Sequence, residues 1–486
     1  MTVDEMAAAL GLPEGVCAGA GGRVLTRAVT DSREAAPGAL FVCVPGARVD
    51  GHDFATSAVE RGAGAVLAAR PLPDLSHRGV PVLVVEDTVR ALGRLAAHWR
   101  DRTAARVVCV TGTAGKTTLK ETLAAILSVH GKTARTPLNH NNQIGMPCAV
   151  LATDGDEAFW VMEAGISHEG DMDELAAILR PDLALILNVG PGHIEGLGGR
   201  GVAWHKARLL AHLAPGGIAL VSADYADLVA EAEATGARPV FFSAGGASAP
   251  HTAVMTDGEA GRCRITLDGE SFIAETPFRG AFGAENAVAA AAAAHLLGLG
   301  AGEISRGFAH AALPPQRCAR KRLGPWRVID DTYNANPLSM RRMLEAAAAE
   351  AAGAGLPLVA VLGEMGELGA ESPRHHEELG RLLAQLGAAA VFWKGGQGER
   401  VKAGLERALG EAAAPRTAVR WTQVSGPEDF LAAWSAWEGL PEGRPDGRTD
   451  GGVLLFKGSR ANRLETLLAA LEAPRAAGQR EGRRVL

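Results

Sequence analysis

The chain has no long apolar run and no targeting segment at its start. No stretch of its 486 residues approaches the roughly 20 consecutive apolar residues that cross a bilayer as a helix. The first residues, MTVDEMAAALGLPEG, have neither the basic start nor the continuous apolar core of a signal peptide. We therefore expect a cytoplasmic protein without membrane insertion.

Closely spaced cysteines are missing as well. No CxxC pair occurs, and two of the six cysteines stand inside strand-like apolar runs, so we expect reduced core residues. We therefore expect neither a disulfide framework nor a zinc site formed by cysteines. The cysteines are Cys17, Cys43, Cys109, Cys148, Cys263 and Cys318.

An excess of basic residues is also missing. The chain carries 49 Lys and Arg against 55 Asp and Glu, a net charge of −6, which gives no reason to expect a nucleic-acid partner. An acidic balance is compatible with a small anionic substrate whose charge a metal neutralises. Only the tail, residues 475–486, is basic, and we expect it to be a solvated end.

The most informative stretch that is present reads VVCVTGTAGKTT, residues 107–118. Its β-branched start predicts a strand, and the apolar positions that follow fall on one face of a helix. Between them, glycine-rich backbone can surround phosphate oxygens, Lys116 adds a positive charge, and Thr117 can place its hydroxyl on Mg²⁺. We expect an ATP or GTP site formed by Gly112, Thr113, Ala114, Gly115, Lys116, Thr117 and Thr118. The match to GxxxxGK[ST] is incomplete, because Val110 stands where the first glycine belongs.

The alternation of apolar runs and helix-like segments predicts an α/β protein with three domains. We expect a small N-terminal α/β domain over 1–100, a central P-loop domain with a mainly parallel sheet over 101–313, a C-terminal Rossmann-like α/β domain over 314–474 and the basic tail. The expected strands are Leu40–Val44, Val107–Thr111, Ala158–Glu163, Leu183–Asn188, Ile218–Val221, Val328–Ile329, Leu358–Leu362, Ala390–Trp393 and Val453–Phe456. A hairpin turning at Asp268-Gly269 and an alanine-rich helix after Gly283 complete the central domain, and 439–452 is a loop.

Polar residues stand at the ends of several predicted central strands, where parallel sheets bind ligands. Glu163 ends one strand, Asn188 ends another, and His193 follows in the next loop. A carboxylate at this edge and Thr117 suit Mg²⁺, and His193 could bind a second metal. The alternatives are a surface ion pair for Glu163, a structural role for His193, and a solvated Lys206 beside a buried aromatic ring.

Three further loops carry candidate binding residues. Ser32 and Arg33 could hold a phosphorylated ligand, although exposed surface explains them equally well. The sequence DDTYNANP, 330–337, lies between a strand and a helix and has more Asp and Asn than one helix cap needs. KGSR, 457–460, offers two cations and a hydroxyl to a carboxylate, or simply starts a helix with exposed charges.

These motifs together resemble the ATP-dependent Mur ligases of bacterial cell-wall synthesis, over nearly the whole chain. TDSR with PGALFV and DGHDF resembles the family's UDP-binding N-terminal domain, and TGTAGKTT resembles its form of the P-loop. TPLNHNNQIG, DDTYNANPLSM, LGEMGELGAES and KGSR are the other matching stretches. No DNPR-type loop, which diaminopimelate- or lysine-adding members carry, is present.

The resemblance implies roles for individual residues. It implies Mg²⁺ ligation by Thr117, Glu163 and His193, and a second Mg²⁺ held through His193 and a carbamylated Lys206; Lys116, His193 and Lys206 would be catalytic. Asn286, Arg317, Asn334 and Asn336 would hold the nucleotide, while Ser32, Arg33, Asn139, Asn141, Asn142, Lys457, Ser459 and Arg460 would bind the other substrates. One departure concerns the family's GxHN, which reads Gly-Ala-Glu-Asn here and puts Glu285 in the place of histidine.

The implied reaction joins D-Ala-D-Ala to a UDP-N-acetylmuramoyl-tripeptide through an acyl phosphate, in a monomeric enzyme that uses ATP and two Mg²⁺. Three alternatives stay open from the sequence. They are a sibling Mur or folylpolyglutamate-type ligase, a P-loop hydrolase acting as a switch or motor, and a nucleotide-binding protein without chemistry.

Overall fold

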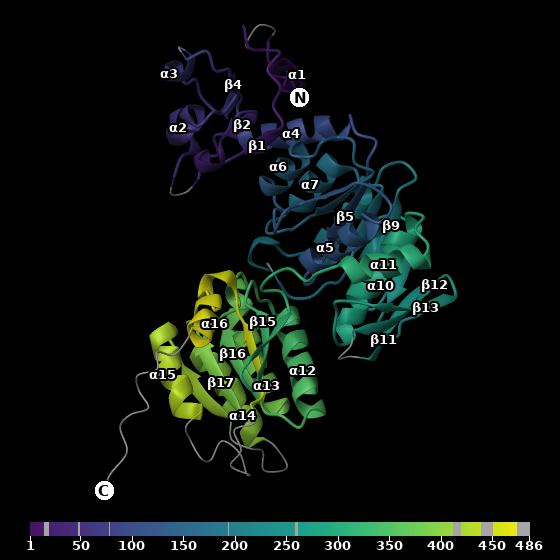
Figure 1. Ribbon diagram of the computed structural model, residues 1–486, viewed down its shortest axis with the longest axis vertical. Helices are drawn as coiled ribbons and strands as arrows, with labels where there is room; N and C mark the ends of the chain where they lie inside the picture. Colours follow the sequence, from purple (N-terminus) through teal and green to yellow (C-terminus); the bar gives the residue numbers. More distant parts are fainter. Residues whose placement is uncertain are drawn as a thin grey trace. The chain divides into compact units, whose positions relative to one another are not determined.

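A computed structural model describes residues 1–13, 19–46, 49–76, 78–192, 194–257, 261–411, 419–438 and 451–473 (Figure 1). Three sheets lie in two compact units, one formed by Met1–Val189 with Gly196–Ala312 and the other by Gly190–Glu195 with Leu313–Leu486. The predicted α/β fold class with mainly parallel sheets is confirmed, whereas the predicted domain boundaries stay predictions. The tail 475–486, His193 and most of the predicted loop 439–452 lie outside the described residues.

The first sheet is small and wholly parallel, with strand order β1-β2-β3-β4. Its strands are β1 (Arg27–Val29), β2 (Ala39–Val42), β3 (Ala65–Ala68) and β4 (Val82–Val84), and its helices are α1 (Val3–Ala9), α2 (Ala55–Glu60), α3 (Pro73–Ser76) and α4 (Thr88–Arg100). The strand predicted over Leu40–Val44 ends two residues earlier, at Val42. Asp50 precedes a short 3₁₀ helix, η2 (Gly51–Phe54), and its side chain caps that helix.

The second sheet contains the predicted P-loop and has the order β13-β12-β11-β10-β9-β8-β5-β7-β6. Strands from β6 to β11 run parallel, and β12 and β13 form the predicted hairpin at its edge. The strands are β5 (Arg106–Thr111), β6 (Thr133–Arg135), β7 (Phe159–Glu163), β8 (Leu183–Ile186), β9 (Ile218–Ser222), β10 (Val240–Ser243), β11 (His251–Asp257), β12 (Arg262–Leu267) and β13 (Glu270–Glu275).

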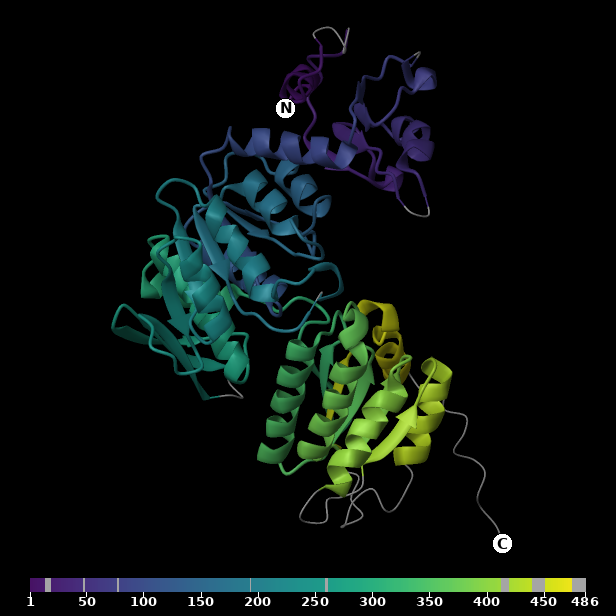
Figure 2. The ribbon, with the colours of Figure 1, turned by 180° about the vertical axis from the view of Figure 1, so that it is seen from behind.

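Helices cover both faces of this sheet, because its central strands are buried along almost their whole length and need apolar neighbours on each side (Figures 1 and 2). The helices are α5 (Lys116–Leu127), α6 (Gly145–Leu151), α7 (Asp171–Leu179), α8 (Val202–Ala207), α9 (Ala226–Ala234), α10 (Ala281–Leu296) and α11 (Ala301–His310). Alanines of α10 allow it to approach α5 closely. This alanine-rich helix begins at Ala281, before the predicted Gly283.

The third sheet has the order β14-β15-β19-β16-β17-β18, parallel except for the β14–β15 hairpin. Its elements are β14 (Ala319–Leu323), β15 (Trp326–Asp331), α12 (Pro337–Gly353), β16 (Leu358–Gly363), α13 (Ser372–Gln385), β17 (Ala390–Lys394), α14 (Gly398–Gly410), β18 (Arg420–Gln423), α15 (Pro427–Glu438), β19 (Val453–Lys457) and α16 (Glu465–Glu472). An aromatic cluster joins α15 and α16 to one face. The short segment Gly190–Glu195 belongs to this unit, and a Cβ on Gly190 would lie 3.1 Å from Leu338 Cδ2.

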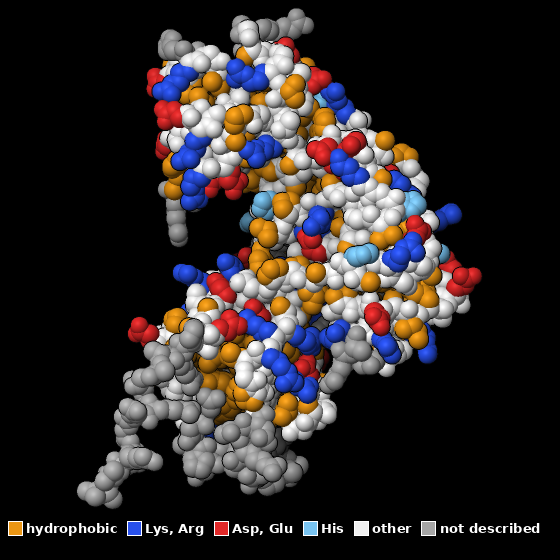
Figure 3. All heavy atoms as spheres, in the orientation of Figure 1, with side chains coloured by type: hydrophobic (Ala, Val, Ile, Leu, Met, Phe, Trp, Pro, Cys, Tyr) orange, Lys and Arg blue, Asp and Glu red, His pale blue; other side chains and the backbone are white. Residues whose placement is uncertain are grey.

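The described residues include free cysteines and a surface of mixed charge. In the part of the chain that the structure describes, no helix has the length and apolarity to cross a membrane. Five cysteines are free thiols, while Cys17 lies outside the described residues. On the face drawn in Figure 3, basic and acidic side chains are interspersed.

Candidate functional site

The predicted phosphate loop lies between β5 and α5, as the sequence indicates. Gly115 caps α5 with φ of +81°, and the half-buried Lys116 donates from Nζ to Gly112 O at 2.9 Å. A Cβ on Gly115 would lie 3.1 Å from Leu187 Cδ2 and 3.2 Å from Asn286 Oδ1, so no side chain fits there without displacement. The left-handed backbone and the crowding together require glycine. They also place Asn286, predicted to bind nucleotide, against this loop.

The side chain of Asn188, just beyond the end of β8, forms hydrogen bonds with the backbone of the phosphate loop. Its Oδ1 accepts hydrogen bonds from Thr113 N at 3.0 Å and Ala114 N at 2.9 Å, and its Nδ2 donates to Ala114 O at 3.0 Å. The strand predicted to run to Asn188 ends at Ile186, which leaves this side chain at the sheet edge. From the sequence, Asn188 was predicted only to lie at the end of a strand. Its hydrogen bonds to the phosphate loop follow from the structure alone.

Glu163 ends β7 and is buried, with 1% of its surface exposed. Its Oε1 accepts a hydrogen bond from Asn141 Nδ2 at 2.7 Å. Among the described residues, nothing forms a hydrogen bond with the buried Oε2. The alternative of a surface ion pair is therefore wrong, and a buried carboxylate oxygen with no described donor fits a cation ligand.

Lys206, on α8, is buried rather than solvated, and its neighbour Trp204 is the more exposed of the two. Burial lowers the pKa of Lys206 well below its usual value, and the nearby charge of Lys116 lowers it further, while Glu163 opposes the shift. The electrostatic interaction of Lys206 with both residues places α8, the phosphate loop and the end of β7 around one site. A lowered pKa increases the share of the amine that is neutral and nucleophilic at a given pH.

The loop from Thr136 to Gly145 lies next to Glu163. Asn141 binds Glu163, and the Asn142 side chain accepts hydrogen bonds from Ile144 N and Gly145 N at the start of α6. Asn139 is exposed. Thus one of the three predicted asparagines orders Glu163, one caps a helix and one is available at the surface.

Lys120 was missed by sequence reasoning. It is fully buried in α5, and its Nζ donates to Thr136 O at 2.5 Å and Leu138 O at 2.7 Å. It therefore anchors the neighbouring loop to the nucleotide helix. A signal was present, since Lys120 lies one turn after Lys116 and next to Leu119 and Leu123, which belong to the apolar face of the helix.

In the C-terminal unit, several predicted residues are already engaged with the protein. Asn336 caps α12 by accepting from Ser339 N at 2.9 Å, and Asn334 Oδ1 accepts from Ala335 N at 2.9 Å. Lys457 is buried and donates to Asp331 Oδ2 at 2.5 Å and Asn334 O at 3.0 Å. The alternative of a helix start with exposed charges is wrong for Lys457.

The other predicted residues of this unit surround Tyr333 and Glu364. The guanidinium of Arg317 lies 4.0 Å and that of Arg460 6.0 Å from the centre of the Tyr333 ring. Ser459 Oγ donates to Glu364 O at 2.6 Å. The DDTYNANP and KGSR stretches thus form one polar edge at the carboxyl ends of β15 and β19.

In the N-terminal sheet, Ser32 is buried and Arg33 is exposed. The Arg33 guanidinium binds Asp31 Oδ2 at 2.6 Å and lowers the pKa of that carboxyl to about 2. An exposed, paired arginine keeps free N–H directions for a phosphate, because guanidinium has five donors.

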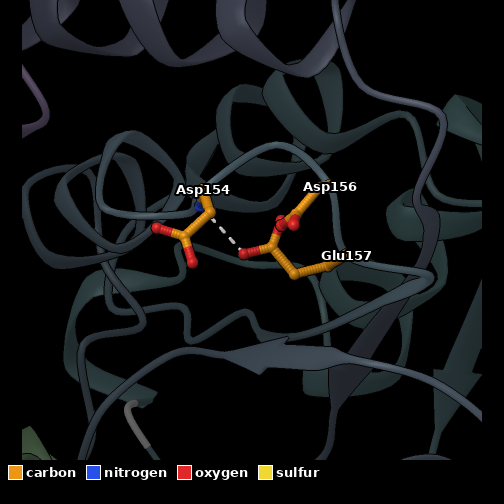
Figure 4. A group of neighbouring side chains, drawn as sticks. All are labelled: Asp154, Asp156 and Glu157. Atoms are coloured by element: carbon orange, nitrogen blue, oxygen red, sulfur yellow. Dashed lines mark hydrogen bonds between the residues drawn. The ribbon is translucent and has the colours of Figure 1, made fainter.

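A separate acidic group offers no convincing metal site. Figure 4 shows Asp154, Asp156 and Glu157 side by side. Glu157 accepts from Asp154 N, Gly155 N and Trp160 Nε1, and Lys132 pairs with both aspartates. Each of the three carboxylates thus already has an ion-pair or hydrogen-bond partner in the protein.

The fold and the site define a P-loop nucleotide-binding α/β protein with a buried lysine and carboxylate beside its phosphate loop. The chain belongs to the Mur ligase family. Models of that family match it over residues 26–100 ("Mur ligase family, catalytic domain"), 110–294 ("Mur ligase middle domain") and 316–460 ("Mur ligase, glutamate ligase domain").

Two curated relatives and two solved structures illustrate the similarity. The UDP-N-acetylmuramoyl-tripeptide--D-alanyl-D-alanine ligase of Escherichia coli K12 is 36% identical over 81% of this chain and 86% of the relative, and that of Bacillus subtilis is 29% identical over 93% and 94%. MurF from Acinetobacter baumannii superposes with a TM-score of 0.81 at 30% identity, over 97% of this chain and 98% of that one. MurF ligase from Thermotoga maritima in complex with ADP gives 0.74 at 27%, over 92% and 97%.

Proposed function

We propose that this chain is an ATP-dependent ligase that joins D-Ala-D-Ala to a UDP-N-acetylmuramoyl-tripeptide, giving the UDP-linked pentapeptide, ADP and phosphate for peptidoglycan synthesis. The observation that carries the proposal is the buried Lys206 beside Lys116 and Glu163 at the phosphate loop. The curated relatives, which this chain matches over 86% and 94% of their length and whose names state this reaction, support the choice of substrates.

The chemistry requires activation of a carboxylate, which is a poor electrophile at neutral pH. A carboxylate oxygen of the tripeptide attacks the γ-phosphorus of ATP, the bond to ADP breaks, and an acyl phosphate forms. The dipeptide amine then attacks the acyl carbon, loses a proton and displaces phosphate. The protein supplies position and charge neutralisation, and Lys116 at the loop is placed to bind the triphosphate oxygens.

Mg²⁺ fits the residues at the carboxyl edge of the central sheet. The buried Glu163 Oε2, with no hydrogen-bond donor in the described part of the chain, and the Thr117 hydroxyl at the start of α5 are the proposed ligands of one ion. When bound, the ion would neutralise phosphate charge. A second Mg²⁺ would be held through His193 and a carbamylated Lys206.

Carbamylation of Lys206 agrees with its environment. Burial lowers the pKa of Lys206 and so favours the unprotonated amine, which can attack CO₂, form an N–C bond and lose a proton. The product is an anionic oxygen ligand. The charge of Lys116 nearby favours an anion at this position.

The remaining roles are distributed over the three sheets. We propose that Ser32 and Arg33 bind the UDP-linked substrate and that Asn139, Asn141 and Asn142 border the reacting groups. Asn286, Arg317, Asn334 and Asn336 would contact nucleotide, and Lys457, Ser459 and Arg460 would order the edge that receives the dipeptide. We further propose that the three predicted domains correspond to these functions, in a monomeric cytoplasmic enzyme.

The test is phosphate release from ATP and Mg²⁺ with a UDP-muramoyl tripeptide, with and without D-Ala-D-Ala, and with product mass as the second readout. Dipeptide-dependent release with the pentapeptide mass is the expected result. Turnover with a different amino acid or with glutamate would identify a sibling ligase. Release indifferent to both peptides would indicate a hydrolase, and no turnover would indicate a site without chemistry.

A variant of Lys116 tests the role of the phosphate loop in this reaction. Lys116→Ala is expected to lower turnover about a hundred- to thousandfold while lowering the melting temperature by only a few degrees, because its side chain is half-buried. Full activity in the folded variant would contradict the assignment.

A further inference from the structure

Glu285 lies on α10 where the related pattern carries histidine, and its contacts lead to the phosphate loop. It is 3% exposed, and its two carboxylate oxygens have different partners. Oε2 accepts a hydrogen bond from Asn188 Nδ2 at 2.9 Å, and Oε1 accepts one from Tyr225 OH at 2.6 Å. The carboxylate therefore connects the residue before α9 with the residue that anchors the loop.

The bond from Asn188 matters because this amide has no spare hydrogen-bonding capacity. Its oxygen takes the N–H groups of Thr113 and Ala114, and its nitrogen donates to Ala114 O and Glu285 Oε2. A primary amide has two donors and two acceptor positions, and all four are used here. Removing Glu285 would leave one buried donor without this acceptor.

Glu285 also decides which way the amide points. An ionised carboxylate only accepts hydrogen bonds, so the atom of Asn188 that faces it must be Nδ2. The oxygen of Asn188 then faces the two loop N–H groups. If the amide were turned over, its NH₂ group would oppose the N–H groups of Thr113 and Ala114.

We propose that Glu285, held by Tyr225, is a positioning residue of the nucleotide site, which acts by orienting Asn188 and thereby fixing residues 113–114 of the phosphate loop. The inference rests on the proposed ATP site and adds two residues, Glu285 and Tyr225, to its support. Glu285, which stands in the place of the histidine of the GxHN pattern, therefore acts through Asn188 and not by direct contact with the nucleotide.

The experiment compares ATP dissociation constants, measured by calorimetry, with the KM values for ATP and for the UDP-tripeptide. Glu285→Ala is expected to weaken ATP binding and raise the KM for ATP about tenfold, because a buried donor loses its acceptor. The kcat at saturating ATP and the KM for the UDP-tripeptide are expected to change by less than about threefold, since the loop is displaced but its side chains remain.

Two conservative variants separate positioning from general stability. Glu285→Gln is expected to retain ATP affinity within about threefold, because its Oε1 can accept from Asn188 while its Nε2 donates to Tyr225. Tyr225→Phe should weaken ATP binding by about threefold, and this effect should vanish in a Glu285→Ala background. Tyr225→Phe also keeps the test decisive if Glu285→Ala does not fold.

Glu157→Ala is the matched control. Glu157 is likewise a buried carboxylate that accepts hydrogen bonds, but its partners are Asp154 N, Gly155 N and Trp160 Nε1. It should lower the melting temperature without changing ATP affinity. A folded Glu285→Ala that binds ATP as wild type does, or a Glu157→Ala that loses affinity equally, overturns the inference. Wild-type protein that fails to bind ATP overturns the proposed function and this inference together.

Discussion

Two buried lysines beside the nucleotide site differ in what surrounds the amine. Lys120 is bonded to Thr136 O and Leu138 O and lies 3.1 Å from Glu121, so the three donors of its ammonium group each have an acceptor. Lys206 has no hydrogen bond or ion pair from Nζ to any described residue, and its burial lowers its pKa. The same residue type therefore clamps a loop in one place and is a buried amine with a lowered pKa in the other.

The hydrogen bonds of Lys120 predict the effect of replacing this residue. Lys120→Met should lower the free energy of unfolding by about 2 kcal/mol, because the buried carbonyl of Thr136 and the part-buried carbonyl of Leu138 lose their donor. Turnover should fall about tenfold, since the loop that holds Asn141 against Glu163 is loosened. Urea unfolding and phosphate release measure the two effects. Lys132→Met, at an exposed lysine paired with Asp154 and Asp156, should change stability by less than about 1 kcal/mol, and equal effects of the two variants would contradict this account.

His376 gives a pH dependence. Burial lowers the pKa of His376 below its usual value, and its neutral ring accepts from Met365 N at 3.0 Å while Nδ1 bonds Ser372 O at 2.7 Å. The unfolded chain takes up a proton near pH 6.5 and the folded one does not, so the free energy of unfolding should fall as the pH drops below 6.5 toward the folded pKa.

The measurement is urea unfolding at pH 7.5 and 5.5, followed by tryptophan fluorescence. The Trp393 ring lies 5.7 Å from the His376 ring and reports on its surroundings. The stability advantage of wild type over His376→Gln should shrink at the lower pH. A difference that is the same at both pH values would show that His376 does not titrate in this range.

Individual residue roles could be predicted where a motif fixed them and not where packing decided them. The strand-loop-helix pattern placed Lys116 and Thr117 correctly at the start of α5. It could not distinguish a buried from a solvated Lys206, because a six-residue helix offers too short a pattern to define its inner face. The anchoring bonds of Asn188 and Glu285 join residues 97 positions apart and leave no local signal.

At the scale of elements, the turn into α5 depends on the backbone of Gly115. Gly115→Ala should weaken ATP binding at least about tenfold, because alanine is strained at φ of +81° and its Cβ would crowd Leu187 and Asn286. Gly353→Ala, at the end of α12, is the control, since a Cβ there meets no atom within 4 Å. Calorimetric titration with ATP should show a loss for the first variant only, and unchanged affinity in Gly115→Ala would refute the steric argument.

The start of α12 separates capping from nucleotide binding. Asn336→Ala should destabilise the protein by about 1 kcal/mol through loss of the cap, and Asn336→Ser should restore most of it, because serine caps helices well. Thermal unfolding checks the cap. Recovery of the KM for ATP in Asn336→Ser would leave capping as the only role and would contradict the proposed nucleotide contact.

Long apolar strands and the hairpin that turns at Asp268-Gly269 were predictable, and the polar edge strands of the third sheet were not. Each central strand of the two larger sheets reads as a continuous apolar run, since both of its faces are covered. The strands β14, with the sequence ARKRL, and β18, with RWTQ, lie at sheet edges and have polar sequences that fit a loop equally well. Their neighbours in the sheet, and not their own sequences, make them strands.

At the scale of the whole molecule, the two compact units each have their own core. We expect them to unfold separately, because cooperative unfolding follows dense contacts. The C-terminal unit holds five of the eight tryptophans, at 326, 393, 421, 434 and 437. Tryptophan fluorescence should therefore report mainly on the unfolding of that unit, whereas far-ultraviolet circular dichroism reports on both units. The urea transitions measured by the two probes should differ. Coincident transitions would mean that the units unfold as one.

The assignment of Gly190–Glu195 to the C-terminal unit has a consequence for synthesis on the ribosome. These residues emerge before Gly196–Ala312, which completes the other unit, and before every strand of the unit to which they belong. At about 5–20 residues per second, the interval is on the order of ten seconds. During this interval the first unit is completed, while Gly190–Glu195 cannot yet pack against its own unit, because that unit has not been translated.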